Sequence, residues 1–369
     1  MPLFYGRFSS DGNLLGSISL GADDVSPCIK QLRRGGTKAL RSLRLYKERS
    51  HPGYHGAMFS YRHAFHAGNH ADVLKHTVLI AVLRHLLQKD SPLAVFDTHA
   101  GAGLYRLDGD YAQTSGEAAN GFLRLTAPAQ KPRSTGGLKS QTAALMANGL
   151  APALQDYVNM VASFNAKGSC RVYPGSPFII QRLLRERDKL KLFELHPTDS
   201  KTLSANIAQL EAGRQVAVLR EDGFEGLRKF LPPPQRRALV LSDPSYEVKT
   251  DYARLVASIS DALTRFATGT YAVWYPIIPR PEAHDVPRKL KTAAVKAGRP
   301  WLHATLTVKS SKIMKDDTGA EQRPGLPASG MFVINPPHTL RTMLETALPQ
   351  MVELLSQDQH ASFSLDAGE

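Results

Sequence analysis

The sequence predicts an α/β fold, a doubly wound domain around a mostly parallel sheet, and three observations support this prediction. Seven short apolar runs are each long enough for a buried strand. Stretches with helical spacing or loop composition separate these runs, a pattern typical of parallel strands joined by crossover helices. The first run ends in an acid and continues into a glycine-rich turn, as strands at the ligand-binding edge of such a sheet do. The predicted strands are residues 93–97, 190–195, 215–220, 238–243, 270–275, 303–308 and 330–335.

Residues 1–57 differ in composition from the rest of the chain. They contain glycine and serine clusters, little hydrophobic periodicity and a basic run from Lys30 to Arg49. Nine Lys or Arg residues and four Asp or Glu residues give this segment a formal charge of 9 − 4 = +5. We expect a poorly ordered basic extension without sheet elements, with Met58 as a natural start of translation. A basic arm that grips RNA is the alternative interpretation.

A more regular pattern begins at Met58. Asn69 is a preferred N-cap residue, and the apolar residues that follow it recur at helical spacing to about Gln88, so we predict a helix there. The ends of the first two predicted strands, Asp97 and Glu194, are 194 − 97 = 97 residues apart. A βαβ unit needs only about 30 residues. We therefore predict a helical subdomain inserted at residues 104–171, within a main domain of residues 58–103 and 172–340. Residues 341–369 are expected to form a C-terminal helix and a tail.

The composition excludes several classes of protein. Hydrophobic residues make up 42% of the 369 residues, too large a share for a disordered chain. No apolar run approaches the roughly 20 residues that a membrane helix requires. The two cysteines, Cys28 and Cys170, are too few for a disulfide framework or a cysteine zinc site. We therefore expect a cytoplasmic protein without a membrane partner. The formal charge of +13 favours a polyanionic partner, and nucleic acid is the leading candidate.

The loop after the first predicted strand, Asp97-Thr98-His99-Ala100-Gly101-Ala102-Gly103, is the strongest local signal. Its glycines permit close approach of the backbone to a ligand at the carboxyl edge of the sheet. Glu194, after the second strand, can accept hydrogen bonds from both hydroxyls of a ribose, and Asp222-Gly223, after the third, can meet the adjoining adenine. Each acid alone is also compatible with a helix N-cap or a solvated strand end. Three acids at consecutive strand ends favour a cofactor that contains adenosine.

The fourth predicted strand ends in Asp243-Pro244-Ser245-Tyr246. The proline stiffens a turn that presents a carboxylate and backbone carbonyls, and the tyrosine offers a flat face. Such a set suits the exocyclic amine of an extruded base, because the acceptors hold the N–H groups while the ring stacks on the base. A strand-to-turn exit with a helix cap is the structural alternative. The similar sequence Asn335-Pro336-Pro337-His338 lies on the last strand, and we interpret it as a structural turn.

Histidines are frequent between residues 63 and 99, and His66 and His70 have the i, i+4 spacing of a helical pair of metal ligands. No HExxH motif accompanies them, so we predict no metal site. The segment Pro174-Gly175-Ser176-Pro177 does not match the GxSxG motif of a serine hydrolase.

Several of these motifs together resemble a known family. The segment 61–76, YRHAFHAGNHADVLKH, is similar to the amino-terminal signature of the bacterial 23S rRNA (adenine-2030-N6)-methyltransferases. Further matches are DTHAGAG at 97–103, YPGSP at 173–177, ELHP at 194–197, DGF at 222–224, DPSY at 243–246 and FATGTYAVWYP at 266–276. The resemblance extends from Met58 to about Pro337.

The resemblance implies a Rossmann-like class I methyltransferase that uses S-adenosylmethionine to methylate N6 of adenine 2030 in 23S rRNA. We expect protein-free or early-assembly RNA to be the substrate and the enzyme to be a monomer that needs no metal. The resemblance implies that Asp243 is catalytic and that Tyr61 faces the RNA, while Pro244 and Tyr246 complete the tetrapeptide at the target base. The implied cofactor contacts are Lys75, His76, His99, Ser176, Glu194, Asp222, Gly223 and Asp243.

Two features depart from the family pattern. Ser245 stands where the family has proline, and the family lacks residues 1–57. A DNA adenine-N6 methyltransferase is one alternative, because the same tetrapeptide serves either nucleic acid. A non-catalytic RNA-binding or ribosome-assembly protein with this fold is the other, and Ser245 is the residue that favours it.

Overall fold

The computed structural model describes residue 63 and residues 66–108, 116–126, 149–166, 169–312 and 325–369, together with the backbone of four short strands. The chain divides into two units, Met1–Arg44 and Leu45–Glu369. In the first unit, strands β1 (Gly6–Phe8) and β2 (Leu14–Ser17) pair in antiparallel fashion. The expectation that residues 1–57 contain no sheet element was therefore wrong for these two strands. The rest of that expectation lies outside the described residues.

The second unit is built on one sheet of eight strands, in the order β14-β10-β13-β9-β8-β3-β6-β7. Neighbours pair in parallel from β7 to β9, whereas β13 is antiparallel to both β9 and β10, and β14 is antiparallel to β10. Six strands therefore run in one direction and two in the other, which confirms the predicted mostly parallel Rossmann-like sheet. The strands are β3 (Ala94–Asp97), β6 (Lys189–Phe193), β7 (Val216–Leu219), β8 (Ala238–Ser242), β9 (Thr270–Ile277), β10 (Trp301–Thr307), β13 (Ala328–Ile334) and β14 (Ser362–Gly368).

The C-terminal strand β14 corrects one prediction. A helix and a tail were expected over residues 341–369. The helix α13 (Leu340–Leu355) matches, but the expected tail contains an eighth strand. β14 pairs with β10 from Ser362 opposite Thr307 to Gly368 opposite Trp301. It carries only two large apolar residues, which is too weak a pattern to identify from sequence. Its pairing comes mainly from backbone hydrogen bonds that the edge of β10 supplies.

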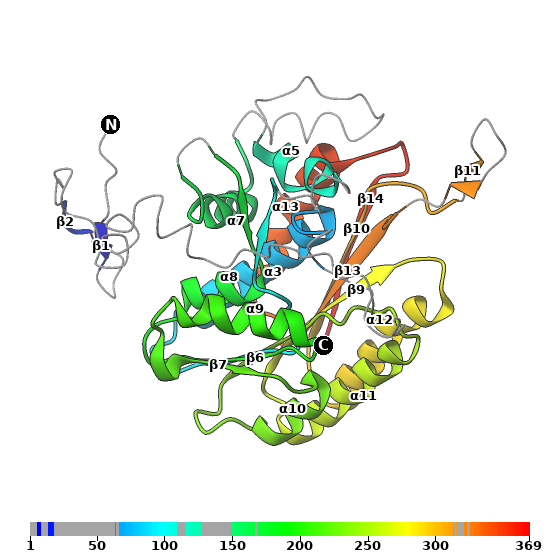
Figure 1. Ribbon diagram of the computed structural model, residues 1–369. Helices are drawn as coiled ribbons and strands as arrows, with labels where there is room; N and C mark the ends of the chain where they lie inside the picture. The colour runs from blue at the N-terminus through cyan, green and yellow to red at the C-terminus, as the bar shows by residue number, and fades with distance from the viewer. Residues whose placement is uncertain are drawn as a thin grey trace. The chain divides into compact units, whose positions relative to one another are not determined.

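Helices cover both faces of the sheet (Figure 1). On one face lie α10 (Gly223–Phe230), α11 (Thr250–Arg265) and α12 (Pro281–Lys296), which bury a large apolar cluster against the strands. On the other lie α3 (His70–Leu86), α8 (Ser176–Leu183), α9 (Pro197–Ala208) and α13. α3 is capped by Asn69, whose side chain accepts hydrogen bonds from the backbone N–H groups of Ala71 and Asp72 at 3.0 Å. Residues 70–83 of α3 are all buried, polar ones included.

A pair of short strands stands at the two ends of the predicted insertion. β4 (Leu104–Arg106) is antiparallel to β5 (Val172–Pro174). Neither strand was predicted: β4 lies in the segment that was expected to be helical, and β5 lies directly after it. Between them, the described residues form a 3-10 turn at Glu117–Asn120 and the helices α5 (Phe122–Thr126) and α7 (Pro152–Ala162). α7 packs on α3 and α13, so the insertion thickens the helical layer behind α3. None of the helices in the described part of the chain is long and apolar enough to cross a membrane.

Candidate active site

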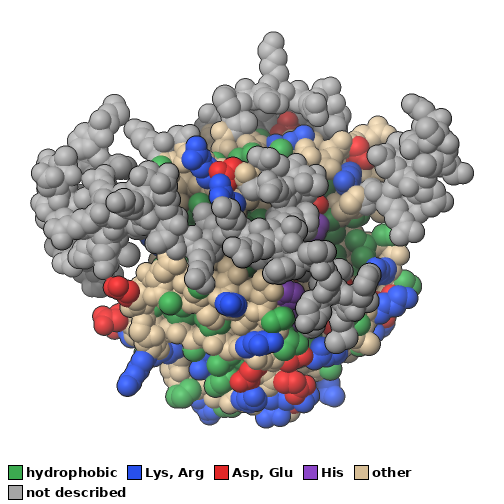
Figure 2. Space-filling view, in the orientation of Figure 1, with side chains coloured by type: hydrophobic (Ala, Val, Ile, Leu, Met, Phe, Trp, Pro, Cys, Tyr) green, Lys and Arg blue, Asp and Glu red, His purple; other side chains and the backbone are tan. Residues whose placement is uncertain are grey.

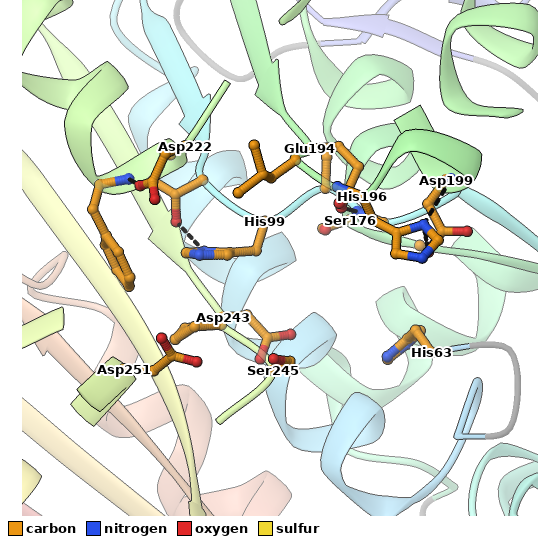
Figure 3. A pocket seen from close by; sticks show the side chains of 18 of the residues that line it. His63, His99, Ser176, Glu194, His196, Asp199, Asp222, Asp243, Ser245 and Asp251 are labelled. Carbon is orange, nitrogen blue, oxygen red and sulfur yellow. Dashed lines mark hydrogen bonds and ion pairs between the residues drawn. The ribbon is translucent and has the colours of Figure 1, made fainter. Parts of the chain in front are cut away.

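A cavity of about 300 Å³ opens at the carboxyl ends of β3, β6 and β8, where the first turns of α8 and α10 also converge (Figure 3). Every residue that the sequence analysis expected to contact the cofactor lies in its wall: Lys75, His76, His99, Ser176, Glu194, Asp222, Gly223 and Asp243. Pro244 lines it as well. Segments far apart in the chain therefore meet at one edge of the sheet, as the parallel topology requires.

The glycine-rich loop after β3 approaches its neighbours closely. Gly101 and Gly103 have φ angles of +60° and +82°, a region that favours glycine. A Cβ atom on Gly223 would lie 2.0 Å from the carbonyl oxygen of Thr98, so only glycine fits where α10 begins. Beneath the loop, the hydroxyl of Ser176 donates to the buried carboxylate of Asp97 at 2.7 Å. These contacts pack the loop after β3 tightly against the first turns of α8 and α10.

Glu194 lies at the end of β6 with its carboxylate in the cavity wall. One carboxylate oxygen accepts a hydrogen bond from the backbone N–H of Gly101 and the other from that of His196, both at 2.7 Å. Burial outweighs these bonds and raises the pKa of Glu194 to about 7. Each carboxylate oxygen has a further lone pair, so the group can still accept hydrogen bonds from a ligand.

Asp222 has two structural partners. It is the N-cap of α10, where its carboxylate accepts from the N–H of Phe224 at 2.9 Å, and it pairs with Arg254 at 2.6 Å. Burial alone would raise the pKa of Asp222, but the hydrogen bond and charge of Arg254 lower it overall. Arg254 also lies 4.9 Å from the ring centroid of Phe224. Asp222 is therefore an ionised acceptor held rigidly at the mouth of the cavity.

Two histidines in the wall, the buried His76 and the half-buried His99, are neutral at pH 7. Burial is the main cause that lowers the pKa of His99 to about 4 and that of His76 to about 3. His76 Nδ1 shares a 2.8 Å hydrogen bond with the hydroxyl of Tyr173. Its Nε2 is buried and has no partner among the described residues. A buried polar atom of this kind is costly unless a ligand completes its hydrogen bond. Together with the acceptor oxygens of Glu194, this unpartnered atom fits a polar cofactor that contains adenosine.

A charged network joins α3 to the end of β8. The ammonium of Lys75 lies 2.9 Å from Asp72 and 2.5 Å from Asp243, and Asp72 also contacts His63 at 3.1 Å. Burial would lower the pKa of Lys75, but the charges of Asp243 and Asp72 raise it overall, so the ammonium stays charged. The side chains of Lys75 and Asp72 are only 6% and 1% exposed, against 17% for Asp243. Lys75 therefore orients the one carboxylate of the network that faces the cavity.

The tetrapeptide after β8 stands between two cavities. Lys75, Asp243 and Ser245 line both the cavity of about 300 Å³ described above, here called the cofactor-sized cavity, and a second cavity of about 660 Å³. Tyr246 lines only the second cavity, where its ring centroid lies 4.7 Å from that of Tyr252. Its φ angle is +56°, a conformation that costs a non-glycine residue on the order of 1 kcal/mol. The structure therefore places the predicted catalytic carboxylate at the junction of the two cavities.

The remaining predicted residues lie outside the two cavities or outside the described residues. Tyr61 lies outside the described residues. Asn335 has a φ of +53° and donates to the carbonyl of Ala267, and it lines neither cavity, as expected of a structural turn. Within the described ranges, no group of three His, Cys, Asp or Glu residues is arranged to hold a metal ion. The lining residues that sequence reasoning missed include His63, Leu195, Val248, Asp251 and Arg254.

Leu195 and Val248 are informative among the missed residues, because they are 48% and 49% exposed, unusual for large apolar side chains. They flank the cofactor-sized cavity from the loops after β6 and β8. A flat apolar ligand such as a purine base would cover them. No sequence signal distinguishes them from core residues, because exposure depends on the packing of distant segments.

The surface charge is spread out rather than gathered. On the face shown in Figure 2, lysine and arginine side chains are distributed over the described surface with acidic side chains between them. Exposed ion pairs of the described chain include Arg228 with Glu225 and Arg288 with Asp285. Such pairs are worth little in stability. The net positive charge therefore acts as a diffuse field rather than as a single stripe on this face.

Comparison with known proteins connects this geometry to a family. A family model described as "Ribosomal RNA large subunit methyltransferase D, RlmJ" matches residues 90–138 and 128–366. Ribosomal RNA large subunit methyltransferase J of Escherichia coli is 40% identical over 292 residues, which cover 79% of this chain and 92% of that protein. The protein of the same name from Haemophilus influenzae is 37% identical over 310 residues, covering 84% of this chain and 98% of the relative.

A solved structure agrees with this relationship. The crystal structure of a Legionella pneumophila protein is 28% identical, with a TM-score of 0.66, and covers 82% of this chain and 98% of its own. The sheet, the cavity at its carboxyl edge and the relatives point in one direction. The chain therefore belongs to the family of S-adenosylmethionine-dependent ribosomal RNA large subunit methyltransferases to which the matching family model and both relatives belong.

Proposed function

We propose that this protein transfers the methyl group of S-adenosylmethionine to N6 of adenine 2030 in 23S rRNA. The observation that carries the proposal is the position of Asp243, at the junction between a cofactor-sized cavity and a larger second cavity. The position in the RNA rests on the resemblance of the sequence motifs. We further propose that the enzyme acts in the cytoplasm as a monomer.

The cofactor contacts follow from the wall of the first cavity. Glu194 accepts hydrogen bonds from the ribose hydroxyls, while Asp222 and Gly223 meet the adenine. Lys75, His76, His99 and Ser176 line the wall beside Asp243 and surround the rest of the cofactor. When bound, the cofactor supplies an electrophilic methyl group on a sulfonium. The formal charges of Asp72, Lys75 and Asp243 sum to −1, which favours a cation at this place.

The residues at the junction then have distinct tasks. The lone pair of N6 is delocalised into the adenine ring, so the amine is a weak nucleophile. Hydrogen bonds from N6–H to the Asp243 carboxylate and the Pro244 carbonyl favour the pyramidal form of the amine. Its lone pair attacks the methyl carbon as the bond from that carbon to sulfur breaks and S-adenosylhomocysteine is released. The methylated amine then gives up one N6 proton, either to Asp243 or to water. Lys75 holds the Asp243 carboxylate in one orientation, and such orientation is the main requirement for an in-line methyl transfer.

The second cavity suits the extruded target base. Trp274 and Tyr246, the latter only 3% exposed, both line it, with 5.9 Å between their ring centroids. An aromatic wall of this kind stacks a base without reading its sequence. Enzymes that modify a base commonly take it out of the stack. From the resemblance of the sequence motifs, we also propose that Tyr61 faces the RNA.

The test is methyl transfer with labelled S-adenosylmethionine and three substrates: protein-free 23S rRNA, large ribosomal subunits and double-stranded DNA. We expect label on one adenine of the rRNA, mapped by nuclease digestion and mass spectrometry. Asp243→Ala should abolish it, and Asp285→Asn, at an exposed acid on α12, should not change it. Label in DNA alone would support the DNA methyltransferase alternative. Binding of cofactor and RNA without any label would support the non-catalytic alternative.

A further inference from the structure

The strained residue of the tetrapeptide is held from outside the tetrapeptide. Tyr246 has a φ of +56°, and the other described non-glycine residues with positive φ, Glu211, Arg236 and Asn335, line neither cavity. A conformation of this kind persists only where neighbouring contacts impose it. Contacts from other segments must therefore keep the loop after β8 in this conformation.

Two contacts on Tyr246 come from the segment that ends β9 and begins α12. The hydroxyl of Tyr246 donates to the carbonyl of Trp274 at 2.5 Å. Arg280, the N-cap residue of α12, donates from Nη1 to the backbone carbonyl of Tyr246 at 3.3 Å. The first contact holds the ring and the second holds the main chain. Among the described residues, Arg280 is thus the side chain that donates a hydrogen bond to the main chain of Tyr246.

Ser245 makes this contact more important. Proline at that position would fix its own φ and restrict the preceding residue, whereas serine does neither. Ser245 is exposed. The loop therefore lacks one local restraint and depends on a tertiary one.

We propose that Arg280 is a positioning residue, which holds the main chain of Asp243-Pro244-Ser245-Tyr246 in its reactive conformation and thereby replaces the stiffness of a second proline. This inference rests on the proposed methyl transfer. Arg280 also lines the second cavity, where a cation would suit an RNA phosphate. Contact with the RNA is the competing role, and the two roles predict different kinetics.

The experiment is a double-mutant cycle of Arg280→Ala and Ser245→Pro, assayed by methyl transfer to protein-free 23S rRNA. For Arg280→Ala we expect kcat to fall about 10- to 100-fold, with little change in KM for RNA or in cofactor affinity. Adding Ser245→Pro should bring kcat back to within about threefold of Ser245→Pro alone, because the proline restores stiffness. Arg280→Lys, which keeps one donor, should lie between the wild type and Arg280→Ala. Arg288→Ala, at an exposed arginine on the same helix, is the matched control.

A second readout does not need turnover. Trp274 and Trp301 are the two tryptophans, so a Trp301→Phe background makes Trp274 the single reporter. Arg280→Ala should increase acrylamide quenching of Trp274 fluorescence, and Ser245→Pro should reverse the increase. Thermal melting will show whether each variant folds.

The kinetic and fluorescence results distinguish a positioning role of Arg280 from a contact with the RNA. A raised KM for RNA with unchanged kcat, not rescued by Ser245→Pro, would overturn the positioning role in favour of an RNA contact. Quenching and kcat that both stay at wild-type values in Arg280→Ala would also overturn it. If the wild type methylates nothing but the quenching pattern holds, the proposed function fails while the positioning role stands.

Discussion

Cofactor affinity should depend on pH through Glu194. Burial raises the pKa of this carboxyl group to about 7, against an ordinary value of 4.5. Ribose hydroxyls donate hydrogen bonds to the ionised carboxylate, so binding favours the ionised form. The affinity should therefore be full above the folded-state pKa and should fall as the pH drops through about 7.

The size of the effect follows from that pKa. A carboxyl group with a pKa of about 7 is roughly 90% ionised at pH 8 and roughly 10% ionised at pH 6. If only the ionised form binds ribose well, the dissociation constant should rise about tenfold between these two pH values. This factor corresponds to about 1.4 kcal/mol of binding free energy.

The assay is calorimetric titration with S-adenosylhomocysteine, which carries the same ribose, at pH 6, 7 and 8. Glu194→Gln removes the titrating group and should give a weaker affinity with a nearly flat pH profile. Glu194→Ala should weaken binding by about 1 to 3 kcal/mol, roughly 5- to 150-fold, without unfolding the protein.

Three results would contradict this role of Glu194. A wild-type affinity that does not change between pH 6 and pH 8 would show that the carboxylate of Glu194 does not hold the ribose. An equally steep profile in Glu194→Gln would show that another group causes the dependence. Unchanged affinity in folded Glu194→Ala would refute the placement of the ribose altogether.

Three further predictions concern the RNA, the extension and the tetrapeptide. Protein-free or early-assembly 23S rRNA should be methylated faster than mature large subunits, as measured by initial rates, and faster methylation of mature subunits would contradict this. RNA binding, measured by filter binding, should weaken steeply as the salt concentration rises. A chain that starts at Met58 should fold and methylate normally, because all candidate site residues follow it. Circular dichroism tests the folding and turnover tests the activity. A truncated protein that is insoluble, or that lacks activity at every salt concentration, would contradict the prediction. Asp243→Ala should abolish methylation, Tyr246→Ala should reduce it severely, and Ser245→Pro should hold or raise it. Initial rates with saturating cofactor and RNA test these variants, and an active Asp243→Ala variant would exclude the proposed role of that carboxylate.

The sequence by itself was sufficient for the central part of the fold. Buried parallel strands are continuous apolar runs, so their pattern is local and readable without the structure. The acids Glu194, Asp222 and Asp243 each end such a run. Since parallel strands present their carboxyl ends at one edge, their convergence could also be predicted. The strand β14 could not, because an edge strand depends on the backbone of its neighbour rather than on its own side chains.

Only the tertiary structure decided how the site is charged and held. Lys75 and Asp243 are 168 residues apart, and their 2.5 Å contact follows from the packing of α3 against the sheet. The raised pKa of Glu194 has the same origin, because burial is set by every segment around a group and not by its neighbours in sequence. The bond from Arg280 to the strained Tyr246 likewise joins two separate loops. Local patterns therefore determine which residues can act, and long-range packing determines their charge state and orientation.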